Sequence, residues 1–415
     1  MSDIPGLPAR RAALQMIDAV LHRGETLETV ERNALRRMRG PADQALARAI
    51  AGETLRWLTD LDLMIDSAMK KPLPHDAKPR SVLRLMLAQW LRLDTPPHAV
   101  IATALPLLSG GPRRLAHGVF STLTKRDGLT LPDAPTLPED VAFRWGSRAG
   151  AIAQGLVTPP PLDLALKDWS ETEERARSMG GTSLAQGHIR LPRGTPIDQL
   201  PSYKDGDWWV QDLAATLPAR LLGPGANGSG GKRVLDLCAA PGGKTMQLAA
   251  AGWKVTALDI SERRLGKVRQ NLDRTGLEAE IIKANALTWE PAKQFDAILI
   301  DAPCTATGTC RRHPDVIHRI GDRQIEEQAE LQNALLERAA GWLPEGSMLV
   351  YAVCSLENSE GIAQAESVGL TQLPITRDEL PEGLEPTEDG WLRTDPGMLG
   401  NSGGLDGFFV GRWRK

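Results

Sequence analysis

Two cysteines each follow a short apolar segment in the second half of the chain. Cys304 ends the sequence Asp301-Ala302-Pro303-Cys304 after the apolar residues 297–300, and Cys354 follows the apolar residues 348–352. If these segments are strands of a parallel sheet, their carboxyl ends meet at one edge, where ligands usually bind. A single cysteine is more often a small buried apolar residue than a reactive one. Two cysteines and a carboxylate at one edge favour covalent catalysis by a thiolate.

Residues 236–245 read Asp-Leu-Cys-Ala-Ala-Pro-Gly-Gly-Lys-Thr and join an apolar segment to a helical pattern. The small residues allow a ligand to approach the backbone where the helix begins. A P-loop is excluded because Cys238 stands where that motif needs glycine, and Ala240 and Pro241 interrupt a dinucleotide fingerprint. Asp259, at the end of the next apolar segment, can accept hydrogen bonds from both hydroxyls of a ribose. Together these features indicate S-adenosylmethionine (SAM), although a tight turn and a capping aspartate would also explain them.

A thiol beside a methyl donor suggests methylation of C5 of cytosine. That carbon is a poor nucleophile until a thiolate adds to C6 and converts the ring into an enamine. C5 can then take the methyl group, after which a base removes the C5 proton and the thiol leaves. The carboxyl group of Asp301 is the candidate for contact with the N3 and N4 edge of the base.

A further group of possible ligands follows the first cysteine, where Cys310, His313 and His318 are close in sequence. Because no second Cys-x2-Cys knuckle exists, we expect no metal site. Arg311, Arg312 and His313 form a basic segment that we expect to contact RNA phosphates. A solvated basic loop would have the same sequence.

The elements that must position these residues follow from the apolar periodicity. Residues 1–130 carry apolar side chains at helical spacing without strand-like alternation, which predicts an all-α domain. Residues 131–206 begin as a proline-rich linker and continue as a small α+β segment. Residues 207–415 alternate strand and helix patterns, which predicts a parallel, doubly wound sheet. Residues 407–411 are expected to form its final edge strand.

The composition is that of a globular protein with more than one domain: 415 residues, 41% hydrophobic and 24% charged. The net charge of -3 is unevenly distributed. Residues 1–130 hold 19 Lys and Arg against 13 Asp and Glu, a balance of +6, and the remainder holds 30 against 39, a balance of -9. The basic segment favours a nucleic-acid partner. Four cysteines, no long apolar stretch and no apolar leader predict a cytoplasmic protein without a membrane partner.

The motifs at 236–245, 301–304 and 351–355 (DLCAAPGGKT, DAPC and YAVCS), with TATGTCRRHPD after DAPC, resemble those of the Sun/Fmu (RsmB-type) RNA cytosine-5 methyltransferases. This resemblance implies a multidomain protein. Residues 1–130 would be a NusB-like helical RNA-binding domain, and residues 131–206 a linker and a small RRM-like α+β subdomain. Residues 207–415 would be an α/β Rossmann-like class I methyltransferase domain.

The resemblance also implies roles for single residues. Cys354 corresponds to the nucleophile and Cys304 to the cysteine that assists product release, whereas spacing alone leaves these roles open. Asp301 corresponds to a residue that touches both cofactor and target base. Asn285 departs from the family, which usually has an aspartate there for the adenine amino group, yet its carbonyl oxygen can accept the same hydrogen bond. The implied cofactor-binding residues are Cys238, Ala239, Ala240, Pro241, Gly242, Gly243, Lys244, Asp259, Asn285 and Asp301.

We therefore expect a SAM-dependent enzyme that forms 5-methylcytosine in RNA, above all in 16S (small-subunit) ribosomal RNA. It should act as a monomer, with no DNA partner. The target base must leave its stack to reach the cysteines. One alternative is a cytosine-5 methyltransferase that acts on tRNA. Another is a non-catalytic RNA-binding or ribosome-assembly factor with a retained methyltransferase fold, and a small-molecule or protein methyltransferase would leave both thiols unused.

Overall fold

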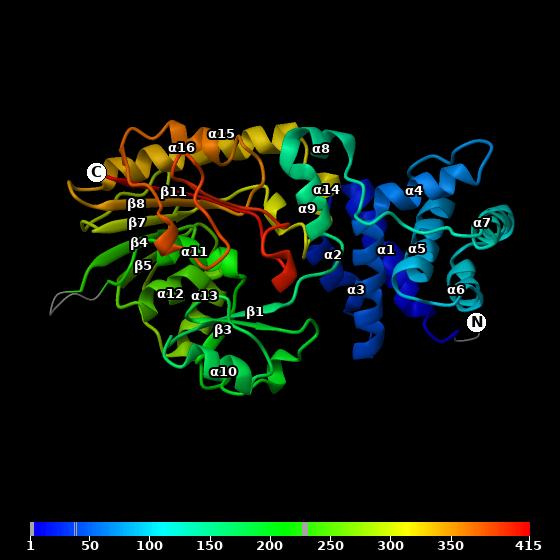
Figure 1. Ribbon diagram of the computed structural model, residues 1–415, viewed down its shortest axis with the longest axis horizontal. Coiled ribbons are helices and arrows are strands. Elements are labelled where there is room, and N and C mark those ends of the chain that lie inside the picture. Colours follow the sequence, from blue (N-terminus) through cyan, green and yellow to red (C-terminus); the bar gives the residue numbers. More distant parts are fainter. Residues whose placement is uncertain (1–3, 37, 39, 226–230) are drawn as a thin grey trace. The chain divides into compact units, whose positions relative to one another are not determined.

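The computed structural model describes residues 4–36, 38, 40–225 and 231–415 (Figure 1). The chain divides into two compact units. The first unit is Met1–Val157 together with Arg312–Ile320, and the second is Thr158–Arg311 together with Gly321–Lys415. Among the residues described, no helix combines the length and the apolar composition that crossing a membrane requires.

The first unit is helical, as the sequence predicts, and its core lies between α1 and the helices α2, α3 and α5 that contact it. Its helices are α1 (Leu7–Arg23), α2 (Leu27–Leu35), α3 (Pro41–Arg56), α4 (Leu58–Ser67), α5 (Lys78–Arg92), α6 (Pro97–Ala104), α7 (Gly110–Leu123), α8 (Glu139–Trp145), α9 (Ala149–Gly155) and α14 (Val316–Arg319). Helices α8 and α9 lie where a proline-rich linker was expected. Pro138 directly precedes α8, a position at which proline starts a helix rather than breaking it, and Trp145 and Ile152 are buried.

A short segment from far along the chain, residues 312–320, completes the first unit. The Leu27 N–H donates a hydrogen bond to Asp315 Oδ2 (3.2 Å), and Arg319 Nε lies 3.0 Å from the same oxygen. His318 Nε2 lies 2.6 Å from the carbonyl oxygen of Leu55. That carbonyl is one of the last in α3 and has no partner within the helix, so His318 satisfies it.

The second unit begins with a small antiparallel sheet in the order β2-β1-β3, formed by β1 (Leu162–Leu166), β2 (His188–Leu191) and β3 (Trp208–Val210), with helix α10 (Thr172–Ser178). Asp163 on β1 accepts two hydrogen bonds of 2.7 Å from Arg190 on β2. It also accepts one from the N–H of Leu213 (3.1 Å), and His188 Nε2 lies 3.2 Å from its Oδ2. Burial alone would raise the pKa of Asp163, but Arg190 and His188 hold it well below its usual range.

The main sheet has the strand order β10-β11-β8-β7-β4-β5-β6. Its strands are β4 (Arg233–Leu237), β5 (Lys254–Asp259), β6 (Glu280–Lys283), β7 (Ala297–Asp301), β8 (Met348–Val353), β10 (Leu392–Thr394) and β11 (Phe408–Arg414), and β9 (Thr371–Gln372) pairs with β11. Strands β4 to β8 are parallel, as predicted. The prediction of a final edge strand at 407–411 is wrong, because β11 lies antiparallel between β8 and β10.

Helices cover both faces of the main sheet (Figure 1). Helices α11 (Leu213–Arg220), α12 (Gly243–Ala250) and α13 (Glu262–Thr275) lie on one face, and α15 (Asp322–Trp342) and α16 (Ile362–Glu366) on the other. Consecutive strand residues point to opposite faces, so Val234 packs in the cluster with Leu248 of α12, and Leu235 in the cluster with Leu336 of α15. The carboxyl ends of four parallel strands, β4, β5, β7 and β8, are thereby held at one edge.

Candidate active site

The loop after β4 turns sharply before α12 begins. Cys238 has φ 60° and Gly242 has φ 104°, and a Cβ on Gly242 would lie 3.2 Å from Cγ1 of Val268. The positive φ of Gly242 favours glycine at that position, and Val268 leaves little room for a side chain. Burial raises the pKa of Cys238 to about 12, so this thiol keeps its proton and does not compete as a nucleophile.

Asp259 ends β5 beside this loop, where its side chain is buried. Its Oδ2 accepts a hydrogen bond from the Ala240 N–H (3.2 Å), and its Oδ1 accepts one from the Ser261 N–H (2.8 Å). Arg264 Nη2 lies 3.6 Å from Oδ2. The predicted ribose acid is thus fixed against the loop that it is expected to serve.

Asp236 lies beneath the loop and was not singled out as a site residue in the sequence analysis. It is fully buried; its Oδ2 accepts a hydrogen bond from the Thr245 hydroxyl (2.5 Å), and its Oδ1 has no hydrogen-bond partner among the described residues. Burial raises the pKa of Asp236 to about 7. A buried oxygen without a donor is a candidate acceptor for a ligand N–H.

Cys304 and Cys354 are brought together by β7 and β8, which are adjacent parallel strands. Their Sγ atoms lie 3.4 Å apart. The backbones of the two loops are also joined, because the Gly308 N–H donates to the Cys354 carbonyl (3.0 Å). The hydrogen bond with Cys354 and burial raise the pKa of the Cys304 thiol well above its ordinary value. The sequence-based prediction that both cysteines lie at one edge agrees with this arrangement.

Asp301 forms an ion pair with Lys244, whose Nζ lies 2.8 Å from Oδ2. The Lys244 side chain is only 8% exposed and lies over the ring of Phe408, with Nζ 5.2 Å from the ring centroid. Sequence reasoning assigned Lys244 to the cofactor loop alone and missed this pairing, because nothing in the spacing connects α12 with β7. The pair joins the start of α12 to the end of β7, the strand that precedes Cys304.

Asn285 follows β6 next to Asp259, whose carbonyl oxygen accepts the Ala284 N–H (3.2 Å). The Asn285 Oδ1 accepts a hydrogen bond from the Leu287 N–H (3.0 Å). An adenine amino group would therefore share this oxygen with the backbone. The role that the resemblance implies for Asn285 toward the adenine amino group stays a prediction.

The three residues expected to contact RNA phosphates lie in different surroundings. Arg311 is buried, only 2% exposed, and donates a hydrogen bond to the Gly403 carbonyl. Arg312 is exposed, and His313 is half-buried, where burial lowers its pKa. The expectation of a basic surface segment therefore does not apply to Arg311, whose guanidinium is buried and bonded to the Gly403 carbonyl.

The metal-ligand spacing noted at Cys310, His313 and His318 is not matched by a ligand cluster. Cys310 is buried, and His318 is bonded to the Leu55 carbonyl. Within the described ranges, no group of three His, Cys, Asp or Glu side chains is arranged to hold a metal ion.

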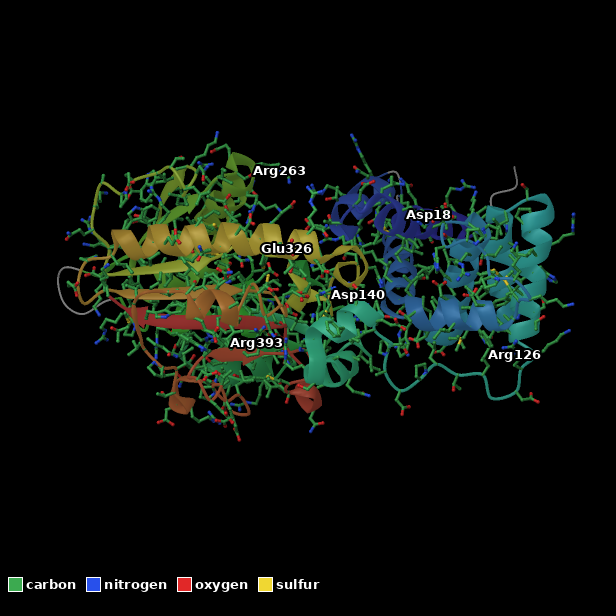
Figure 2. The ribbon with its side chains drawn as sticks, turned by 90° about the horizontal axis from the view of Figure 1, so that it is seen from above. Asp18, Arg126, Asp140, Arg263, Glu326 and Arg393 are labelled. Atoms are coloured by element: carbon green, nitrogen blue, oxygen red, sulfur yellow. The ribbon has the colours of Figure 1, made fainter. Side chains whose placement is uncertain are left out.

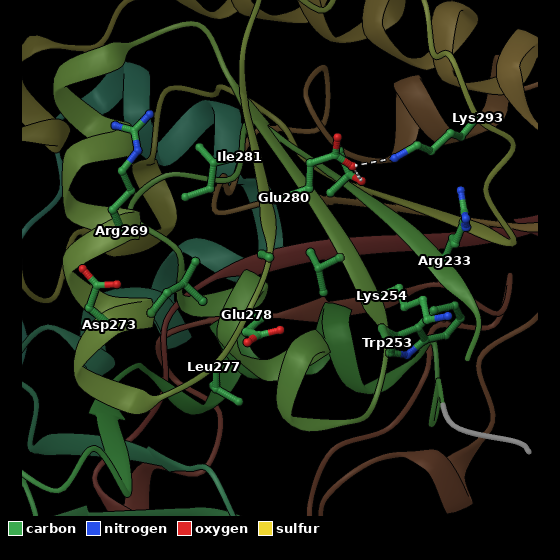
Figure 3. A pocket seen from close by; sticks show the side chains of 14 residues that line it. Arg233, Trp253, Lys254, Arg269, Asp273, Leu277, Glu278, Glu280, Ile281 and Lys293 are labelled. Atoms are coloured by element: carbon green, nitrogen blue, oxygen red, sulfur yellow. Dashed lines mark hydrogen bonds and ion pairs between the residues drawn. The ribbon is translucent and has the colours of Figure 1, made fainter. Parts of the chain in front are cut away.

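A groove of about 740 Å³ lies elsewhere on the second unit (Figure 3). Arg233, Lys254 and Glu280, which line it, are the first residues of β4, β5 and β6. The groove is therefore at the amino ends of the strands. Cofactors of doubly wound sheets bind at the carboxyl ends, so this groove is separate from the candidate active site.

The residues at the carboxyl edge suit SAM. The glycine turn opens onto the start of α12, Asp259 offers a carboxylate for the ribose, and Asp236 Oδ1 lacks a donor. Ile260, next to Asp259, is 63% exposed and would offer an apolar surface to the adenine ring. A Rossmann-like sheet with this edge defines a SAM-dependent methyltransferase.

Comparisons with known proteins extend this assignment. A family model described as 16S rRNA methyltransferase RsmB/F matches residues 226–412, and the NusB family model matches residues 7–109. The chain is 31% identical to ribosomal RNA small subunit methyltransferase B of Xylella fastidiosa, covering 100% of this chain and 99% of that protein. It is 32% identical to the protein of the same name from Klebsiella pneumoniae, covering 85% and 88%. The chain belongs to the ribosomal RNA small subunit methyltransferase B family.

A solved structure agrees with the fold of about two thirds of the chain. A methyltransferase homologue from Pyrococcus horikoshii superposes with a TM-score of 0.54 at 28% identity, covering 67% of this chain and 93% of that one. The NusB match to residues 7–109 confirms the prediction that the helical N-terminal region has a NusB-like fold. The resemblance noted in the sequence is thereby confirmed at the level of the family.

Proposed function

We propose that this protein methylates C5 of a specific cytosine in 16S ribosomal RNA, through a covalent bond between Cys354 and C6 of the base. The observation that carries the proposal is the pair of Sγ atoms 3.4 Å apart in the loops that follow the adjacent parallel strands β7 and β8. The printed names of the relatives supply the RNA class. The reaction would take place in the cytoplasm, and the basic residues of the helical first unit would add phosphate contacts.

The proposed reaction consists of addition to C6, methyl transfer to C5 and elimination of the thiol. The Cys354 thiolate adds to C6, and a proton reaches N3 as the C5–C6 double bond gives way to an enamine. Bound SAM supplies the methyl group to C5. The C5 proton and the N3 proton then leave, the Cys354–C6 bond breaks, and Cys354 recovers its electron pair.

The residues around Cys354 have distinct parts in these steps. Asp301, held by Lys244, is the carboxyl group at this edge that can exchange a proton with N3. Cys304 retains its proton in the free enzyme, because the hydrogen bond with Cys354 and burial raise its pKa. Its sulfur is therefore placed to exchange a proton as the adduct breaks down.

The test is transfer of labelled methyl groups from SAM to unmodified 16S ribosomal RNA, with the product nucleoside identified by mass spectrometry. We expect 5-methylcytidine with the unaltered protein and no transfer with Cys354→Ala. Methylation of tRNA alone would favour the alternative substrate, and no methylation of any RNA by the folded protein would favour the assembly-factor alternative. Retained transfer by Cys354→Ala would refute the nucleophile assignment.

A further inference from the structure

A buried carboxylate connects the two loops that carry the cysteines. Glu360 Oε1 accepts a hydrogen bond from the Thr305 N–H (2.8 Å), and its Oε2 accepts hydrogen bonds from the hydroxyls of Thr305 and Ser355. Thr305 directly follows Cys304 in the chain, and Ser355 directly follows Cys354. One carboxylate thus holds the residue next to each thiol.

Glu360 is itself held in place by its own surroundings. Gln332 on α15 donates to its Oε1 (3.1 Å) and to the carbonyl of Pro303 (2.8 Å), and the Tyr351 hydroxyl donates to the Glu360 carbonyl (2.6 Å). Arg393 of β10, labelled in Figure 2, donates to the carbonyl of Ser355 (3.1 Å). The carboxylate is therefore anchored to α15 and to β8 as well as to both cysteine loops.

A carboxylate is an unusual side chain at a fully buried position such as that of Glu360. Glu360 has no exposed surface, and the ion pairs found among the described residues do not include it. Burial raises the pKa of Glu360. An uncompensated buried carboxylate is costly, and apolar side chains of similar volume usually fill such space at lower cost. Its hydrogen bonds to both cysteine loops offset this cost and fix their separation.

We infer that Glu360 is a positioning residue that clamps the Cys304 and Cys354 loops, so that both thiols face the same C5–C6 bond of the target base. The inference rests on the proposed function for its chemical meaning. Its geometric content, that Glu360 keeps the two sulfur atoms adjacent, can be measured without any RNA substrate.

The first experiment measures this geometry by oxidation of the intact protein with diamide. Diamide oxidises the two thiols to a disulfide and is reduced to its hydrazine, and mass spectrometry of the joined peptides gives the rate. We expect Glu360→Ala to slow formation of the Cys304–Cys354 disulfide by about tenfold, and Glu360→Gln to retain most of the rate because an amide oxygen still accepts the Thr305 N–H. Glu366→Ala, which removes an exposed carboxylate at the end of α16, is the matched control.

The second experiment separates attack from release. RNA that contains 5-fluorocytosine traps the adduct because fluorine cannot leave as a proton does, so its rate of formation reports attack by Cys354. We expect Glu360→Ala to slow this rate about 10- to 100-fold, since small misplacements of a reacting group have effects of this size, with the Kd values for SAM and RNA within about twofold of the unaltered protein. Ser355→Ala should slow attack, and Thr305→Val should slow release, seen as adduct accumulating on ordinary RNA.

The outcomes distinguish the two proposals. If the unaltered protein forms no adduct, the proposed function fails, and the disulfide rates still decide whether Glu360 positions the thiols. If Glu360→Ala matches Glu366→Ala in both disulfide and adduct rates, the positioning role is overturned and the proposed function stands. If Glu360→Ala is unfolded by circular dichroism, Thr305→Val and Ser355→Ala decide in the same way, with unchanged rates in both overturning the clamp.

Discussion

Asp236 predicts a pH dependence of stability that can be separated from all other titrations. In the folded, cofactor-free protein, burial raises its pKa from the usual 3.8 to about 7, with Asp301 and Asp259 adding repulsion and only Thr245 and Lys244 opposing it. The folded state therefore holds a proton that the unfolded state releases between these two values. Linkage then requires the free energy of unfolding to fall as pH rises from about 4 to about 7.

The magnitude follows from the two pKa values. The full shift corresponds to about 4 kcal/mol, at about 1.4 kcal/mol per pKa unit. Somewhat less than half of this loss is already present at pH 5, so between pH 5 and pH 8 the stability should fall by about 2–3 kcal/mol. Asp236→Asn cannot titrate and keeps a partner for the Thr245 hydroxyl. The variant should therefore gain about 2–3 kcal/mol relative to the unaltered protein over that range.

The assay is thermal unfolding of the cofactor-free protein from pH 5 to pH 8, in which other titrating groups cancel between variant and parent. The second unit contains Asp236 and is a large folded unit. For a unit of roughly 150–250 residues, the difference in Tm between Asp236→Asn and the parent should grow by about 5–10 °C. Asp273→Asn, which alters an exposed aspartate on α13, should change the pH dependence little. Parallel Tm curves for Asp236→Asn and its parent would refute the assignment of this titration to Asp236.

Three further predictions concern single contacts. Arg190→Met leaves the Asp163 carboxylate buried without its bidentate partner, so thermal or urea unfolding should show a loss of about 3–5 kcal/mol, and a loss under 1 kcal/mol would contradict the buried network. His318→Leu removes the partner of the Leu55 carbonyl and should destabilise the helical unit by about 1–3 kcal/mol in thermal unfolding, whereas an unchanged transition would mean that residues 312–320 do not stabilise it. Asn285→Asp adds a second oxygen beside the adenine site, so calorimetry should show SAM binding roughly fivefold tighter, and weaker binding would exclude that placement.

The sequence was informative wherever local pattern determines position. Alternating strands and helices predicted the parallel sheet, and parallel strands necessarily bring their carboxyl ends to one edge. The convergence of Cys304, Cys354 and Asp301 followed from that rule, and so did the position of Asp259 near the glycine loop. These features depend only on the order and direction of the strands, which the alternation of strand and helix patterns predicts.

Features that depend on long-range contacts could not be predicted. Strand β11 pairs with β8 on one side and β10 on the other, and the local sequence of β11 does not identify these neighbours. Asp315 accepts a hydrogen bond from Leu27, 288 positions earlier in the chain, and no local signal links the two. Arg311 is buried and donates a hydrogen bond to the Gly403 carbonyl, 92 positions later in the chain, and no local signal links the two. Glu360 stands in a segment without clear periodicity, and its role emerges only when both cysteine loops surround it.

The most direct test of the covalent mechanism compares two variants on ordinary 16S ribosomal RNA with SAM. Cys304→Ala should accumulate a protein–RNA adduct that survives denaturing electrophoresis, because attack proceeds and release is impaired. The double variant Cys304→Ala with Cys354→Ala should form no adduct, since the nucleophile is missing. An adduct of equal intensity in the double variant would show that the bond is made by a group other than Cys354, and the account of the two cysteines would be wrong.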